Sequence, residues 1–220
     1  MPQKRKPHDI IPPENMPRSA VDRPIQDVDR LFARAFGWYD APVQTAARIA
    51  LEQGGVALGD IGCGSGNTLR TWSREVGHAA CRTNGISATG VNKFDYSDQS
   101  GYPATVKACA DGTIRYIVAD VAEGIPIEDG SLDVALAYRS IEHCADPSGW
   151  MREMLRVTRP GGAVFFTADT HSQFGRSDPL PDLLQSTPFV EEPALEHARI
   201  ETQMGNVLYL TLGRLVMPAA

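Results

Sequence analysis

The chain has 220 residues, of which 42% are hydrophobic and 22% are charged, a composition typical of soluble globular proteins. The length suits one domain with one sizeable core, and no apolar run is long enough to cross a bilayer. The formal charge of −6 disfavours a broad nucleic-acid-binding face, because phosphate contacts need lysine or arginine. We therefore expect a single domain with no membrane span, and nucleic acid is not a favoured partner.

The four cysteines and five histidines are scattered without the spacing of a metal site. The cysteines form no Cys-x-x-Cys pair, and no hydrophobic signal region precedes them. We therefore expect a reducing, cytoplasmic location and no metal ion. The sequence leaves the oligomeric state open.

The N-terminal part of the chain divides into a tail and two helices. Residues 1–24 hold several prolines and bury too little apolar surface to fold, so we expect a disordered tail there. Apolar residues recur at helical spacing over residues 25–36, and Gly37 follows as a stop signal. A second helix is predicted to start after Ala41-Pro42 and to run to residue 52. Together residues 25–54 form a predicted helical cap.

A buried strand that runs into a glycine-rich turn is the most informative feature of the sequence. The strand covers residues 56–61, and three alternate glycines follow it: Gly62, Gly64 and Gly66. Glycine tolerates positive φ and has no Cβ, so such a turn can approach a nucleoside-bearing ligand closely, although it also occurs for packing alone. Asn67 stands where a dinucleotide fingerprint has another glycine, which weakens a pyrophosphate interpretation. A helix is predicted beyond Gly66, to about residue 76.

The next part of the chain alternates strand and helix signals. Apolar or β-branched runs predict strands at residues 87–91, 114–119, 132–138 and 163–168. Residues 93–112 lack a clear amphipathic pattern and are predicted to form a loop. A helix is predicted to start at Asp146, with Pro147 in its first position, and to stop at residues 159–162.

The C-terminal part is predicted to be a long loop followed by a hairpin. Residues 171–193 hold several prolines among aromatic and acidic residues and are too many for a simple connector. Because open α/β sheets bind ligands at the carboxyl ends of their strands, we expect a substrate-side loop region there. Residues 199–204 and 207–215 flank the turn pair Gly205-Asn206, which predicts a hairpin.

Five stretches of the sequence carry a family resemblance. They are residues 60–66, 120–121, 129–133, 139–143 and 156–162. In this order and spacing they resemble the small class I S-adenosylmethionine-dependent methyltransferases. The resemblance implies one Rossmann-like α/β domain over residues 25–220, with a mostly parallel seven-stranded sheet, helices on both faces and a C-terminal antiparallel hairpin.

The resemblance also implies a set of cofactor-binding residues. The backbone from Gly62 through Cys63 and Gly64 to Gly66 would lie against the methionine part and the ribose of S-adenosylmethionine, and Asp60 would orient its amino group. Asp120 would accept from the adenine amino group, with the Val121 amide beside the ring. Two of these residues have simpler interpretations from the sequence: Cys63 fills tight space, and Asp120 caps the next turn.

One position departs from the family pattern. An acid usually ends the second strand and bonds the two ribose hydroxyls, but this chain has Asn92 there. An amide offers one uncharged oxygen acceptor, so the exchange forfeits roughly 1–2 kcal/mol. Asp95 is an alternative partner for the ribose.

His143 follows the fourth predicted strand and is the candidate general base, because imidazole titrates near neutral pH. The alternative is a structural role, in which it packs or caps a turn beneath the cofactor. The signatures of nucleobase methyltransferases are missing here, which favours a small-molecule acceptor. Four aromatic residues are candidate pocket walls or, equally, plain core: Trp38, Tyr39, Phe174 and Phe189.

Three functions remain open from the sequence. The first is an active methyltransferase that acts on an oxygen, nitrogen or carbon atom of a metabolite and releases S-adenosylhomocysteine. The second, which Asn92 favours, is a weak or inactive cofactor-binding module that works through a protein partner. The third is a nicotinamide-dependent oxidoreductase, which Asn67, Asn92 and the later motifs disfavour.

Overall fold

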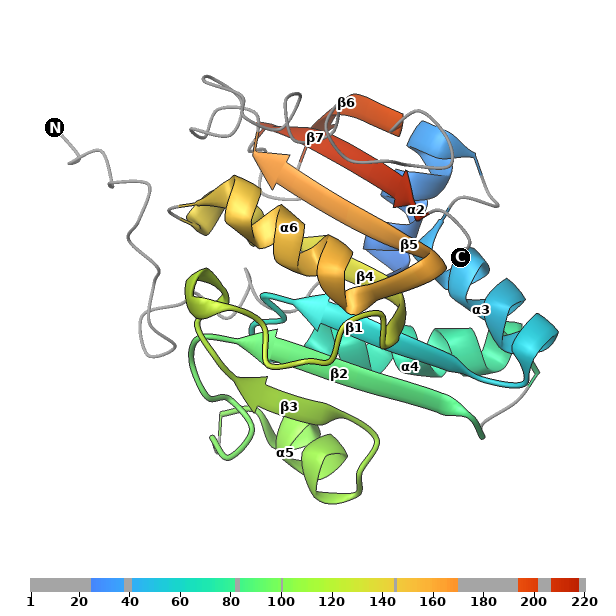
Figure 1. Ribbon diagram of the computed structural model, residues 1–220, viewed down its shortest axis with the longest axis vertical. Coiled ribbons are helices and arrows are strands. Elements are labelled where there is room, and N and C mark those ends of the chain that lie inside the picture. The colour runs from blue at the N-terminus through green and yellow to red at the C-terminus, as the bar shows by residue number, and fades with distance from the viewer. Residues whose placement is uncertain are drawn as a thin grey trace, which may run out of the picture.

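Seven strands form one sheet in the computed structural model, which describes residues 25–37, 41–81, 84–99, 101–144, 146–169, 194–201 and 207–217 (Figure 1). The strands are β1 Val56–Ile61, β2 Ile86–Asn92, β3 Arg115–Val118, β4 Leu132–Tyr138, β5 Thr158–Asp169, β6 Ala194–Glu201 and β7 Val207–Val216. Their order across the sheet is β3-β2-β1-β4-β5-β7-β6. β7 runs antiparallel to β5 and β6, whereas the other neighbours pair in parallel. The predicted mostly parallel sheet with a C-terminal antiparallel pair is confirmed.

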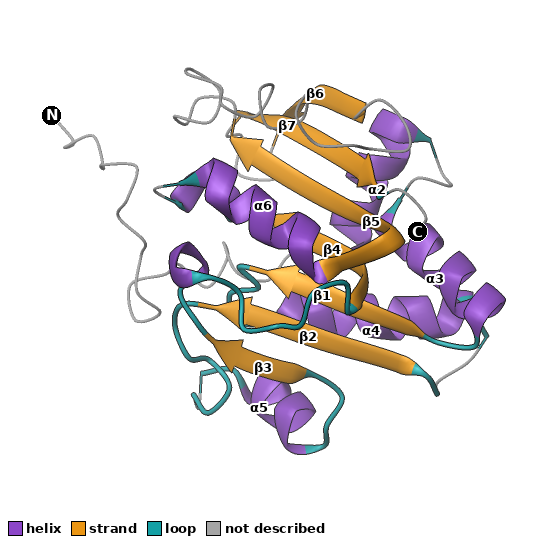
Figure 2. Cartoon of the chain, in the orientation of Figure 1, coloured by secondary structure: helices purple, strands orange, loops and turns teal. Residues whose placement is uncertain are grey.

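Helices cover both faces of this sheet (Figure 2). They are α2 Ile25–Phe36, α3 Pro42–Gln53, α4 Asn67–Ala79, α5 Pro103–Ala110 and α6 Pro147–Val157, with short 3₁₀ turns η3 Val121–Glu123 and η4 Ile141–His143. α2, α3 and α4 lie on one face, and α6 lies on the other. Among the described residues, no helix has the length and apolar character needed to cross a membrane.

The central strands are apolar on both sides because both faces are buried. In β4, Val134 and Leu136 pack into the core beneath α3 and α4, while Ala135 and Ala137 pack into the core beneath α6. This alternation follows from the two-residue period of a strand. A strand covered on both faces therefore reads as a continuous apolar run, and the prediction of β4 over residues 132–138 is confirmed.

The predicted loop over residues 93–112 is wrong, because α5 occupies part of it. α5 has eight residues and buries only two side chains, Thr105 and Ala108. Such a short helix leaves no apolar stripe in the sequence. Its one local signal is Pro103 at the first helical position.

Other boundaries differ by a few residues. α4 extends to Ala79 rather than ending near residue 76, and β6 begins at Ala194 rather than at residue 199. α6 ends at Val157, and β5 begins at once, because Thr158 already pairs with Leu132 of β4 before a local irregularity. Three predicted features fall outside the described residues: the tail 1–24, the loop region 171–193 and the turn pair 205–206.

Two aspartates accept hydrogen bonds from backbone amides at the starts of helices. Asp146 accepts a hydrogen bond from the Gly149 amide at 2.8 Å, as expected for the start of α6. Asp29 of α2 accepts from the Val43 amide at 2.9 Å and so ties α2 to the start of α3. Burial raises the pKa of Asp29, with this hydrogen bond acting in the opposite sense. α2 and α3 are therefore joined by a buried polar contact as well as by packing.

Arg156 anchors the segment before β4 to α6. Its guanidinium donates to the carbonyl oxygens of Ile125 at 2.7 Å and Ile127 at 3.0 Å. The same group pairs with Glu153 at 2.7 Å and with Asp129. A guanidinium supplies this many donors in a fixed plane, whereas an ammonium is a single point of charge.

We expect Arg156→Lys to lower the free energy of unfolding by about 1–3 kcal/mol, because lysine leaves carbonyl oxygens of the anchored segment without donors. Urea unfolding measures the change. The control is Arg152→Lys on the same helix, whose ion pair with Asp146 is exposed and 3.5 Å long; it should change stability by less than about 0.5 kcal/mol. Equal losses in the two variants would contradict the anchoring role.

Candidate functional site

The parallel strands bring most of the predicted site residues to one edge of the sheet. Asp60 lies near the carboxyl end of β1, Asn92 ends β2, Asp120 follows β3, and His143 follows β4 on η4. From β1 the chain adds β2 and β3 on one side of the sheet and then β4 and β5 on the other side, so the strand order changes direction between β1 and β4. Open α/β sheets bind ligands in the crevice at such a point.

The three glycines of the turn after β1 have different surroundings. All have positive φ, of 80° at Gly62, 53° at Gly64 and 73° at Gly66. A Cβ added to Gly62 would lie 2.4 Å from the Ser140 Cβ, and one added to Gly66 would lie 3.4 Å from Thr105. A Cβ added to Gly64 would meet nothing within 4 Å. Gly62 is therefore required by packing, whereas Gly64 presents bare backbone to open space.

Cys63 is buried and fills space next to β2. A Cβ added to Gly90 would lie 2.7 Å from its Sγ, so the thiol occupies the room that this glycine leaves. Burial raises the pKa of the Cys63 thiol well above its ordinary value, which disfavours the thiolate. These contacts favour the space-filling interpretation of this residue.

The turn is tied to the chain beyond β2 through side chains. Asn92 accepts a hydrogen bond from the Gly64 amide at 3.3 Å and donates to the Phe94 carbonyl at 2.9 Å. The Tyr116 hydroxyl of β3 lies 2.6 Å from the Gly64 carbonyl oxygen. Thr105 of α5 donates to the Ser65 carbonyl oxygen. Sequence reasoning missed Tyr116 and Thr105, because nothing local to either residue indicates its contact with the turn.

The Asp120 carboxylate already forms a hydrogen bond and an ion pair within the protein. One of its oxygens accepts from the Ala122 amide at 3.1 Å and so caps η3, and the other lies 2.5 Å from Lys93 Nζ. The hydrogen bond from Lys93 holds the pKa of Asp120 below its ordinary value. The capping interpretation is thus present in the structure. Val121, the next residue, is buried among the apolar residues that face α6.

Asp60 is a buried carboxyl group with an altered acidity. Asp60 is 2% exposed, and burial raises the pKa of its carboxyl group to about 7. Removal of the carboxylate from water is the cause of this shift. A positive group brought to it would stabilise the carboxylate.

Asp95 and His143 both lie on the surface. Asp95 is exposed and accepts from the amide and hydroxyl of Ser97 at 2.8 and 2.6 Å, which closes a local turn. His143 is exposed on η4. The four aromatic residues predicted as pocket walls lie outside the described residues.

The chain is strained directly after β4. Arg139 has a φ of 51°, which is uncommon for a residue with a side chain, and its amide donates to the Thr167 hydroxyl of β5 at 2.9 Å. Sequence reasoning missed this bend, because only the pairing of β4 with β5 brings Thr167 to Arg139. Strained backbone of this kind is frequent at functional sites.

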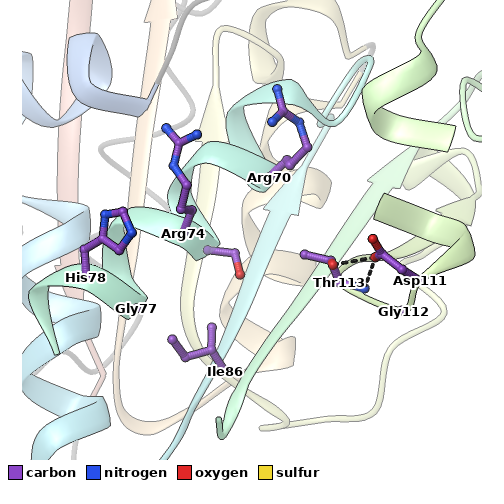
Figure 3. A pocket seen from close by; sticks show the side chains of 9 residues that line it. Arg70, Arg74, Gly77, His78, Ile86, Asp111, Gly112 and Thr113 are labelled. Carbon is purple, nitrogen blue, oxygen red and sulfur yellow. Dashed lines mark hydrogen bonds between the residues drawn. The ribbon is translucent and has the colours of Figure 1, made fainter. Parts of the chain in front are cut away.

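A separate hollow of about 480 Å³ lies between α4 and the segment that joins α5 to β3 (Figure 3). It is lined by Arg70, Ser73, Arg74, Gly77, His78, Ile86, Asp111, Gly112 and Thr113. The hollow extends along α4 from Arg70, whose amide donates to the Gly66 carbonyl oxygen at 2.9 Å, toward Ile86 at the start of β2. Arg70 bonds Asn67 and Arg74 bonds Glu75, so both cations are engaged by neighbouring side chains. We therefore place the candidate site at the turn.

A family model described as "Methyltransferase domain" matches residues 59–166, from within β1 to within β5. This match, which covers just under half of the chain, and the relatives and solved structures described below support a class I S-adenosylmethionine-dependent methyltransferase. The matched span contains the glycine-rich turn and all of the strand ends described above. In this family the cofactor is S-adenosylmethionine.

Curated relatives carry several substrate names. The chain is 29% identical over 153 residues to "Malonyl-[acyl-carrier protein] O-methyltransferase" of Serratia marcescens, covering 64% of this chain and 52% of the relative. It is 30% identical over 126 residues to "2-methyl-6-phytyl-1,4-hydroquinone methyltransferase" of Synechocystis, covering 57% and 36%. The chain thus spans about half the length, or less, of these relatives.

Solved structures share the fold at low identity. A SAM-dependent methyltransferase from Aquifex aeolicus superposes with a TM-score of 0.52 at 14% identity, covering 87% of this chain and 97% of that one. The [4+2]-cyclase SpnF gives a TM-score of 0.52 at 16% identity, covering 91% and 98%. At these identities the likeness establishes the Rossmann-like methyltransferase fold alone.

We expect Gly64→Ala to weaken binding of S-adenosylhomocysteine by at least about tenfold, because its Cβ enters the space into which the turn opens. Isothermal titration calorimetry measures the affinity. The matched control is Gly112→Ala, which has a φ of 74° and also meets nothing within 4 Å but lies outside the turn, between α5 and β3. Both variants carry a similar backbone strain of roughly 1–2 kcal/mol. An equal loss of affinity in both would contradict the position of the site.

The acidity of Asp60 predicts a pH-dependent stability. The folded chain keeps this proton up to about pH 7, while an unfolded chain releases it near pH ~4, so stability falls as the pH rises between these values. Relative to the parent, Asp60→Asn should therefore gain at least about 1 kcal/mol of unfolding free energy between pH 5 and pH 8. Urea titrations at each pH measure this, and a constant difference would contradict the raised pKa.

Proposed function

We propose that the chain transfers the methyl group of S-adenosylmethionine to a small-molecule acceptor. The observation that carries the proposal is the turn after β1, where Gly64 presents bare backbone to open space at the carboxyl edge of the sheet. The turn lies inside the span that matches the family model. The fold by itself does not decide the chemistry, since function depends on the site.

The residues around the turn fit this cofactor. Its positive amino group suits the buried carboxyl group of Asp60, and its methionine part and ribose suit the backbone at Gly64, where no side chain intervenes. Asp120 remains the proposed acceptor for the adenine amino group. It must then share its carboxylate with Lys93 and the Ala122 amide.

The protein's part in the reaction is mostly positioning. A bound sulfonium supplies an activated methyl group, so the side chains need to orient an acceptor in line with it and exclude water. We propose that the acceptor lies at the carboxyl ends of β4 and β5, where the chain continues into residues 171–193. The domain extends in this proposal over residues 25–220, and its cytoplasmic location remains a prediction.

The names of the relatives point to acceptors of more than one type: a malonyl group on a carrier protein, a hydroquinone and, in a rice relative, the sterol cycloartenol. We propose an organic metabolite with an oxygen or carbon nucleophile. A carboxylate acceptor is already ionised and needs no base, whereas a hydroxyl acceptor must lose a proton. In the second case His143 is the proposed base, since it follows β4 at this edge of the sheet.

One observation favours the alternative of a weak or inactive binding module. Asn92 and Asp120 occupy the two positions that bind the adenosyl group in the family, and both are already hydrogen-bonded within the protein. Such a module would bind the cofactor and act through a protein partner. The fold also accommodates other chemistry, since SpnF, which shares it, is named as a [4+2]-cyclase.

Label transfer distinguishes the two candidates. The protein is incubated with S-adenosylmethionine labelled on the methyl group and with malonyl thioesters, hydroquinones and sterols in separate reactions. An active enzyme should label one class and release S-adenosylhomocysteine, and Gly64→Ala should reduce the rate by at least about tenfold. Binding without transfer to any class would support the alternative.

A further inference from the structure

We infer that Asn92 is a positioning residue, which with Tyr116 clasps the glycine-rich turn at Gly64 rather than bonding the ribose as an acid does in the family. We call the side chains of Asn92 and Tyr116, together with the backbone of Gly64 and Phe94, the Gly64 clasp. The inference deepens the proposed function and rests on it, because the clasp shapes the proposed cofactor site.

Both ends of the Asn92 amide are occupied. Its Oδ1 accepts from the Gly64 amide at 3.3 Å, and its Nδ2 donates to the Phe94 carbonyl oxygen at 2.9 Å. One partner is a donor and the other an acceptor, so the network fixes which way the amide points. Asn92 thus joins the turn after β1 to the chain after β2.

Tyr116 makes the second link between the same two segments. Its hydroxyl lies 2.6 Å from the Gly64 carbonyl oxygen and 3.0 Å from that of Phe94, so its single proton is shared between them. Burial raises the pKa of Tyr116 far above its ordinary range, which keeps the hydroxyl a donor. The amide of Gly64 is therefore held by Asn92 and its carbonyl by Tyr116.

This arrangement explains why an amide stands at the end of β2. A carboxylate only accepts hydrogen bonds, so an aspartate at position 92 would serve the Gly64 amide but set a charged oxygen against the Phe94 carbonyl. An asparagine has nearly the same shape and both accepts and donates. The departure from the family acid is thus a requirement of the clasp.

The clasp leaves a defined surface for a ligand. Both peptide groups of Gly64 are bonded toward Asn92 and Tyr116, while the position of its missing Cβ faces open space. A turn held in one conformation does not have to be ordered when a ligand binds, which raises affinity. Loosening the clasp should therefore weaken binding without removing any direct contact with the ligand.

Exchange of Asn92 for the family acid separates the two roles. If Asn92 bonded the ribose, Asn92→Asp would bind S-adenosylhomocysteine more tightly than the parent, because a charged acceptor is the stronger one. In the clasp, Asn92→Asp should weaken binding by about tenfold, as should Asn92→Ala, and Tyr116→Phe by roughly three- to tenfold. The control is Asp111→Asn, a carboxyl-to-amide exchange in a similar local turn with Thr113, which should stay within about twofold.

Calorimetric affinities are measured alongside thermal unfolding, so that affinity is compared among variants that remain folded. In the double variant Asn92→Asp, Tyr116→Phe, the loss should be smaller than the product of the two single losses, because each breaks the same clasp. Tighter binding by Asn92→Asp, or losses that multiply in the double variant, would overturn the inference. Failure of the parent to bind S-adenosylhomocysteine would instead overturn the proposed function.

Hydrogen exchange tests the clasp without any ligand. The Gly64 amide donates to Asn92, so its exchange should accelerate by at least about tenfold in Asn92→Ala. The Gly62 amide donates to the Val91 carbonyl at 2.8 Å and serves as the internal control, with an unchanged rate. An unchanged rate at Gly64 would overturn the clasp whatever the affinities are.

Discussion

Burial of the parallel sheet on both faces is the constraint on which the remaining structure depends. With α2, α3 and α4 against one face and α6 against the other, the interiors of the central strands hold little besides apolar side chains. Polar residues with a chemical role are therefore displaced to the strand ends. Since β1 to β5 are parallel, their carboxyl ends meet at one edge, and there Asp60, Asn92 and Asp120 come together.

The turn after β1 is shaped by its neighbours as much as by its own glycines. Positive φ values make the bend possible, but the position of Gly64 is set by Asn92 from β2 and Tyr116 from β3. α5 adds a bond from Thr105 to the Ser65 carbonyl. Three separate elements thus hold a backbone segment that has few side chains with which to hold itself.

Much of the fold could be predicted, because each strong element carries its own signal. The apolar run of β4 and the Asp146-Pro147 start of α6 both occur as the sequence indicates. α5 was unpredictable for the opposite reason, since a short helix with two buried side chains has no periodic pattern. In the site, the glycines and the capping role of Asp120 were evident from the sequence, but the partners of Asn92 and the pairing of Asp120 with Lys93 were not.

The sequence by itself determined the strands, the glycine-rich turn and the family, since these rest on local residue patterns and on their order. The tertiary structure alone decided that β7 lies between β5 and β6, because strand order depends on pairing between distant segments. It also decided that the Asn92 amide bonds Gly64 and Phe94, and that Lys93 occupies Asp120. Hydrogen bonds of this kind join separate strand ends, and no local pattern records which ends will meet.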